Sequence, residues 1–398
     1  MSLLADSTAE NSIAEIPRQT TGTPEARADS GHRAYFVSPM VDFFCLGGGS
    51  LIVLPLIALL LPAESSMPAV TLVMLLLTNV INHPHFAHSY QIFYRNFRRK
   101  AFGGETPPAL RRRYIFAGIV APALLFVFFA VSVAQPDARM LGLGMNLMGF
   151  LVGWHYIKQG YGMAIVDSVF KRLFYSDQTK KLMLVNGYAC WMLGWMLANR
   201  EVSERNIWGI SAHSIEIPDP LFYAVAGCTA VTSALALFAL FTAWRKNGGK
   251  IAINGVIAYL TTLYLWIVFI KINPLFILIV PAFHSLQYLL VVWRFQLNLE
   301  HDQPQAREYP RRKWLGRLTP TNATTRFTLF VATGTALGAV CFWIIPLLFS
   351  AIGTYDREVF GGTLFFFICW IFINIHHYFL DNVMWRRENP DTKKHLFS

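Results

Sequence analysis

Long apolar runs recur along most of this 398-residue chain. Runs of about 17 to 25 apolar residues match a helix that crosses a bilayer, and hydrophobic residues make up 54% of the chain against 14% that are charged. Because helices satisfy their backbone hydrogen bonds inside lipid, we predict an all-α, polytopic transmembrane helix bundle of about ten spans. These are Phe43 to Leu61, Met67 to Ile81 with a helical continuation to about Tyr94, Tyr114 to Ala134, Met140 to Ile157, Leu182 to Ala198, Leu221 to Trp244, Ile251 to Ile270, Pro274 to Leu297, Phe327 to Ser350 and Gly361 to Leu380.

Lysine and arginine are concentrated in every second loop. Short loops rich in these residues stay in the cytoplasm. With ten spans, the two tails and every second loop share one side and hold most of the 34 basic residues, whereas the alternate loops hold only Arg139, Arg200, Arg205, Lys271 and Arg357. This pattern predicts cytoplasmic termini and a multi-pass protein of a bacterial-type inner membrane. The net charge of +11 is spread over separate loops, which favours membrane lipids as partners and not nucleic acid.

The chain divides into three predicted parts. Residues 1–36 lack an apolar core and are expected to form a disordered cytoplasmic tail, residues 37–385 a membrane domain, and residues 386–398 a basic cytoplasmic tail. The five cysteines stand singly, without a CxxC pair, so no disulfide framework is indicated. Two GxxxG pairs, Gly149 with Gly153 and Gly334 with Gly338, are typical of close helix packing.

Four of the predicted spans carry histidines. The segments are NHPHFAH from Asn82, WHYIKQGYG from Trp154, FHSLQY from Phe283 and NIHHYFLDN from Asn374. Distances along the chain to the following basic residues place three of the four groups in the half of the bilayer nearer the cytoplasm. His155, sixteen residues before Lys171, is expected somewhat deeper or on a longer helix. Ionisable residues inside a bilayer are costly and normally face the bundle interior. Since neutral imidazole is the commonest metal ligand, the segments predict a metal site with candidate ligands His83, His85, His88, His155, His284, His376, His377 and Asp381.

Further polar residues near these histidines are candidates to orient the ligands. They are Tyr90, Lys158, Gln159, Gln287 and Tyr288. Gln159 lies four residues after His155, so the two share a helix face. Adjacent residues such as His376 and His377 point about 100° apart on a helix, so at least one of them can be structural, and Asp381 can instead neutralise Lys158. Pro84 is expected to break or kink the second helix beside the site.

The layout resembles the histidine-box membrane oxygenases, the desaturase and hydroxylase group, and more loosely the bacterial carotene-cleaving dioxygenases of the Brp/Blh type. His83 and His88 match the HxxxxH box of desaturases, whereas no HxxHH box follows. The resemblance implies a mono- or dinuclear non-haem iron centre and O2-dependent oxidation. It also implies an apolar substrate, such as a carotenoid, another isoprenoid or an acyl chain, and an electron donor.

Two other functions fit the same residues. A haem b electron carrier or haem-handling protein needs only two of the histidines, on facing helices. A proton- or ion-coupled transporter would use histidines with Lys158, Asp167 and Asp381 as a relay. Soluble-enzyme signatures such as GxGxxG after a strand, a P-loop or GxSxG are absent from the sequence, and no catalytic residue is assigned.

Overall fold

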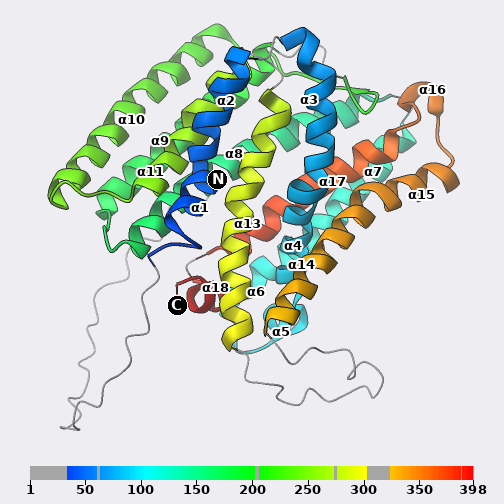
Figure 1. Ribbon diagram of the computed structural model, residues 1–398. Coiled ribbons are helices and arrows are strands. Elements are labelled where there is room, and N and C mark those ends of the chain that lie inside the picture. The colour runs from blue at the N-terminus through cyan, green and yellow to red at the C-terminus, as the bar shows by residue number, and fades with distance from the viewer. Residues whose placement is uncertain are drawn as a thin grey trace, which may run out of the picture. The chain divides into compact units, whose positions relative to one another are not determined.

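Helices form nearly all of the part of the chain that the computed structural model describes (Figure 1). It describes residues 34–60, 63–135, 137–201, 206–272, 276–302, 323–386 and 388–397. The only strands in these ranges are β1 (Asn206–Ile207) and β2 (Ile210–Ser211), a short antiparallel pair. The prediction of an all-α chain is therefore confirmed. The predicted disordered tail, residues 1–36, lies almost wholly outside the described residues.

Nine helical segments of the described residues are long and apolar enough to cross a membrane. Several of them contain more than one helix, joined end to end. In chain order they comprise α1 (Pro39–Phe43), η1 (Phe44–Gly48) and α2 (Gly49–Leu60); α3 (Ala63–Leu77), η2 (Thr78–Asn82) and α4 (His83–Tyr94); α6 (Pro108–Ile115), η3 (Phe116–Val120) and α7 (Ala121–Ala134); α8 (Arg139–Phe170); α10 (Asp219–Lys246); α11 (Ile253–Leu260), η4 (Thr261–Leu265) and α12 (Trp266–Ile272); α13 (Phe276–Asp302); α14 (Ala323–Ala339), η6 (Val340–Ile344) and α15 (Ile345–Ile352); and α17 (Leu364–Met384). By length and composition this is a multi-pass membrane protein.

The remaining helices are α5 (Phe97–Phe102), α9 (Asp177–Glu201), α16 (Arg357–Phe360) and α18 (Pro390–Leu396). Helix α9 contains the fifth predicted span, Leu182 to Ala198, and packs against α8 and α10. It is long enough to cross a bilayer, but it is not among the nine because it carries more polar side chains. The count of ten spans and the cytoplasmic termini stay predictions.

The second span continues without a gap into the histidine segment. Between α3 and α4 the helix widens into the π-helical turn η2, and Pro84 stands in the first turn of α4 directly after it. A π turn adds one residue to a helical turn and leaves backbone groups without their usual partners, which suits a position before proline. The expected break at Pro84 is thus a local widening, and the helix runs on to Tyr94 as predicted.

One of the two GxxxG pairs brings helices together. A Cβ added at Gly334 of α14 would overlap the His88 ring, and one at Gly338 would come within 2.9 Å of the backbone of His83. Helix α14 therefore packs closely on α4 through these glycines. In the other pair, Gly149 has no atom within 4 Å of such a Cβ, and a Cβ at Gly153 would lie 3.4 Å from the Trp191 ring of α9, an ordinary contact. That pair therefore marks no close approach of two backbones.

The last residues of the chain fold back on the bundle. Helix α18 packs on α13, where Leu396 and His395 are buried. The buried Arg294 of α13 donates hydrogen bonds from Nε to the carbonyl oxygen of Leu396 (3.1 Å) and from Nη1 to that of Tyr35 (2.6 Å). Both ends of the described chain are thus fixed to α13, one of the four histidine-bearing helices.

Candidate metal centre

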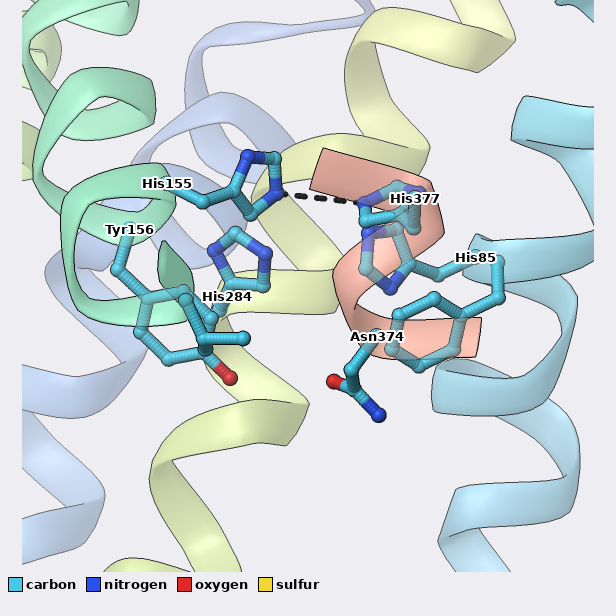
Figure 2. Close-up of a pocket in the computed structure, with 8 residues that line it drawn as sticks. His85, His155, Tyr156, His284, Asn374 and His377 are labelled. Carbon is cyan, nitrogen blue, oxygen red and sulfur yellow. Dashed lines mark hydrogen bonds between the residues drawn. The ribbon is translucent and has the colours of Figure 1, made fainter. Parts of the chain in front are cut away.

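Four histidines from four helices meet in the interior (Figure 2). They are His85 on α4, His155 on α8, His284 on α13 and His377 on α17, and all four are buried. The ring centroid of His377 lies 4.4 Å from that of His85 and 4.9 Å from that of His155. The ring of His284 lies 4.9 Å from His155 and 5.3 Å from His85. We call this group the histidine cluster.

Three members of the cluster have the spacing of metal ligands. One ring nitrogen each from His85, His155 and His377 lies within 4.8 Å of the other two, and Nε2 of His377 is 3.3 Å from Nε2 of His155. Nitrogens bound to a metal at about 2.0–2.1 Å lie roughly 3 to 4 Å apart. The cluster lines a cavity of about 10 Å³, close to the smallest volume that holds a water molecule. The three residues can therefore hold a metal ion.

A carboxylate completes the donor set. Asp381 follows His377 by one helical turn, and its Oδ2 lies 3.3 Å from Nε2 of His377 and 3.7 Å from Nε2 of His155. Among the described residues, Oδ2 is buried without a hydrogen-bond partner. Imidazole nitrogens together with a carboxylate oxygen are ligands of iron and of other first-row transition metals.

Hydrogen bonds fix the tautomer of His377. Tyr288 donates its hydroxyl proton to Oδ1 of Asp381 (3.0 Å). The Tyr288 oxygen can then only accept the 2.7 Å hydrogen bond from the hydroxyl of Ser89. With its single proton used, the Ser89 oxygen accepts from Nδ1–H of His377, 2.7 Å away. This leaves a lone pair on Nε2 of His377, the nitrogen that faces His155.

His85 is held in the same way by a second serine. The Ser285 hydroxyl donates to Oδ1 of Asn82, so its oxygen accepts from Nδ1–H of His85 over 3.2 Å. Nε2 of His85 is then an acceptor, and it is buried without a partner among the described residues. Both serines therefore turn an imidazole lone pair toward the cavity.

The cluster thus collects buried polar atoms that have no hydrogen-bond partner in the described chain. Besides Nε2 of His85 and Oδ2 of Asp381, both ring nitrogens of His284 are buried without partners, and that ring stacks on Tyr156 with centroids 3.8 Å apart. Leaving a buried polar atom unpaired costs about 1–3 kcal/mol. Nε2 of His377 and Nε2 of His155 are within hydrogen-bond distance of each other, so a proton on His155 can bridge this pair when no ion is present. A cation bound at the centre would take the place of that proton and would pair the remaining acceptors.

Two predicted ligands of α4 lie outside the cluster. The His88 ring stacks on Phe330 of α14, and its Nδ1 is hydrogen-bonded to Oε1 of Gln91 (2.8 Å). The His83 ring stacks on Phe342 with centroids 4.1 Å apart. Both residues pack against the α14–α15 span, on another side of the helix from His85.

His376, a third predicted ligand, also has other partners. Its Nδ1 is 2.9 Å from the Tyr90 hydroxyl, and its Nε2 is 2.9 Å from the carbonyl oxygen of Ala117. Both ring nitrogens are thus already paired, and Tyr90 serves this histidine instead of a cluster ligand.

Apart from Tyr288, the other predicted orienting residues form no hydrogen bond to an imidazole of the cluster. Nε2 of Gln159 donates to the carbonyl oxygen of His284 (2.9 Å) and to Oε1 of Gln287 (3.1 Å), which ties α8 to α13 without a bond to an imidazole. Lys158 donates from Nζ to Oδ1 of Asn382 (2.5 Å) and forms no ion pair with Asp381 within 4 Å.

Sequence reasoning missed the residues that orient the rings. Ser89 follows His85 by four residues and Ser285 is adjacent to His284, but serine is common in membrane helices and gives no signal by itself. Tyr156 and Asn374, which also line the cavity (Figure 2), were equally inconspicuous.

The size of the cavity bears on the haem hypothesis, and the contacts of Asp167 bear on the hypothesis of a proton or ion relay. The four rings surround a cavity of about 10 Å³, so a bare ion fits between them and a porphyrin does not. The Asp167 carboxylate accepts hydrogen bonds from Lys171 Nζ (3.0 Å) and from the backbone N–H of Gly255 (2.8 Å). This residue therefore joins α8 to α11 and does not face the histidine cluster.

No protein-family model matches this chain, and neither does any curated protein or solved structure. The chemistry of the site therefore has to be inferred from its donor atoms and surroundings.

Proposed function

We propose that the chain is a membrane oxidoreductase whose histidine cluster holds non-haem iron and oxidises an apolar lipid or isoprenoid with dioxygen. His85, His155, His284 and His377 supply imidazole nitrogens, and Asp381 supplies a carboxylate oxygen. The observation that carries the proposal is the convergence of four buried imidazoles and one carboxylate on one small cavity, where several of their polar atoms have no hydrogen-bond partner among the described residues.

The donor set is one that iron uses. Imidazole with carboxylate is found in non-haem iron sites and also in catalytic zinc sites, so the choice of iron rests on the apolar surroundings and the proposed oxidation of a lipid. When bound there, iron would supply the binding and activation of dioxygen. Cleavage of a double bond that places one oxygen atom in each product needs no further electrons, whereas hydroxylation or desaturation takes two electrons from an external donor. The number of electrons that the protein takes from an external donor in each reaction cycle would distinguish these reactions.

The residues of the chain prepare the site for such chemistry. Ser89 and Ser285 hold the protons of His377 and His85 on Nδ1, so that both Nε2 atoms are ready to bind a cation. Asp381 contributes a negative charge that offsets part of the charge of the ion. Phe86 and Val152 give the cavity apolar walls, which keep water out and suit an apolar substrate.

Only one part of the resemblance to membrane oxygenases supports the proposal. The desaturase-like pairing of His83 with His88 plays no role in it, because both rings pack on the α14–α15 span. The idea that remains is a histidine-ligated iron inside a helix bundle, as in the carotene-cleaving enzymes.

Metal analysis with an absorption spectrum tests the proposal. Protein purified from iron-supplied cells should contain about one or two iron atoms per chain and no haem absorption, and it should consume oxygen when given a carotenoid or an acyl lipid. His155→Ala should lose the iron and the oxygen consumption together. A metal-free protein would show that a shared proton relieves the facing lone pairs, and a zinc-only protein would exclude redox chemistry; either result would overturn the proposal.

A further inference from the structure

A second cavity lies between α5 and α6, away from the histidine cluster. It has a volume of about 400 Å³ and is lined by Ala101, Phe102, Pro108, Arg111, Arg112 and Ile115. Helices α5 and α6 pack on each other at the same end of the bundle as α18 (Figure 1). We call this cavity the arginine groove. Its volume falls in the range of small-molecule sites.

The two arginines of the groove stand in an unfavourable position for cations. They lie in the second turn of α6, near the end of the helix where the backbone dipole is positive, and Arg113 follows directly. Neither Arg111 nor Arg112 has an ion-pair partner within 4 Å among the described residues. Adjacent like charges without counter-charges repel one another, so this place favours a bound anion. Guanidinium groups bind phosphate through paired, charge-assisted hydrogen bonds.

The remaining walls of the groove are apolar. The Phe102 side chain is 58% exposed although it borders two arginines, and Ile115 lies one turn further along the span that α6 begins. A free inorganic anion would make no use of these walls. The groove also lies where a candidate membrane span starts, which is the level of lipid phosphate groups.

We propose that the arginine groove binds one anionic phospholipid of the adjacent leaflet. Arg111 and Arg112 bind its phosphate, and Phe102 and Ile115 contact the start of its acyl chains. The exposed side chains of Phe116 and Ile119 continue this apolar surface along the span. The site does not depend on the proposed iron chemistry.

Retention of lipid by the purified protein tests this proposal. The full chain is placed in phosphatidylcholine nanodiscs with a small fraction of phosphatidylglycerol, released into mild detergent and examined by native mass spectrometry. The wild type should keep one phosphatidylglycerol, and the Arg111→Gln/Arg112→Gln variant should bind it about tenfold more weakly. The matched control is Arg98→Gln/Arg99→Gln, which removes the same charge from exposed residues of α5 outside the groove and should keep the lipid.

Two outcomes would overturn the proposal. Equal loss in both double variants would show a diffuse attraction of the basic surface to anionic lipid. Displacement of phosphatidylglycerol by millimolar inorganic phosphate, together with no effect of Phe102→Ala, would show a free-anion site. Size-exclusion elution and far-UV circular dichroism of the same samples separate unfolding from loss of lipid and keep this test independent of the proposed iron site.

Discussion

Two of the polar clusters that the described helices bury differ in how their hydrogen bonds are arranged. In the first, Nδ2 of Asn186 on α9 donates to the hydroxyls of Tyr259 (3.0 Å) and Tyr264 (2.6 Å). Tyr259 donates onward to a backbone carbonyl, and Tyr264 donates to Ser233 (2.9 Å). Ser233 in turn donates to Oδ1 of Asn186 (3.0 Å). Every proton in this asparagine network has an acceptor inside the network or on the nearby backbone.

In the histidine cluster, by contrast, the Nδ1 protons of two imidazoles point away from the centre of the cluster. Ser89 and Ser285 receive the Nδ1 protons of two rings, and the lone pairs on the opposite ring nitrogens remain at the centre. A closed network needs nothing more, whereas buried polar atoms without partners favour a bound cation. The comparison therefore separates a cluster that stabilises helix packing from one suited to binding.

Removal of a ring from the histidine cluster should have the largest effect. His377→Ala deletes a donor that faces both His155 and Asp381, so we expect at least about a hundredfold loss of metal affinity, measured as metal per chain after dialysis against a weak chelator. His376→Gln is the matched control, because that neighbouring ring is paired with Tyr90 and Ala117. Full metal content in His377→Ala would rule out the cluster as the metal site.

Removal of an orienting serine should have a smaller effect on the same property. Without Ser89 the Nδ1 proton of His377 loses its acceptor, and the ring is free to turn or to change tautomer. We expect Ser89→Ala and Ser285→Ala each to lower metal affinity about 10- to 100-fold. Ser132→Ala is the control, since Ser132 is buried on α7 but donates only to a backbone carbonyl (2.8 Å). An unchanged affinity in both variants would refute the tautomer assignment.

Disruption of the asparagine network should lower the stability of the protein and leave its metal content unchanged. Asn186→Leu removes the residue that links both tyrosines and leaves Tyr264 and Ser233 with fewer partners. Because hydrogen bonds in membrane proteins contribute modestly, we expect a loss of about 1–3 kcal/mol in the free energy of unfolding, measured by denaturant titration in detergent. A parallel loss of metal would mean that the two clusters are coupled.

A change outside both clusters should have the smallest effect. Gly338→Ala places a methyl group 2.9 Å from the backbone of His83, so α14 must move away from α4. We expect a loss of about 1 kcal/mol, because the better helix propensity of alanine offsets part of the crowding. Gly149→Ala, with open space around its added methyl group, should be neutral or slightly stabilising. A larger loss in Gly149→Ala than in Gly338→Ala would contradict the packing.

The sequence alone predicted the elements well because it encodes them locally. The length of the apolar runs marks the spans, and the polar residues scattered along α9 make it less apolar than the nine candidate spans although its length suffices to cross a bilayer. The depth of the histidines followed from their distance to basic residues, and it brought His85, His155, His284 and His377 to one layer.

What the sequence could not predict was the rotation of each helix about its own axis. Residues 83, 85 and 88 of one helix point in three directions, and only the neighbours of α4 decide which ring faces α17 and which faces α14. His376 and His377 pose the same question on α17, where the contact with Ala117 takes one ring and the contact with Ser89 takes the other. The orienting serines were hidden for a related reason, since their role depends on a partner about 200 to 290 residues away along the chain.

The π-helical turn before α4 has a consequence for how this protein can change. A π turn holds one residue more than an α turn, so loss of a single residue from Thr78–Asn82 would restore regular winding. Because one π turn and one α turn both complete about one full rotation, the two parts of the span would keep nearly the same angular phase. His85 would then still face the other three rings. A one-codon deletion inside the turn could thus be tolerated with the site intact, whereas a deletion in the regular winding of α4 before His85 would turn that ring away by about 100°.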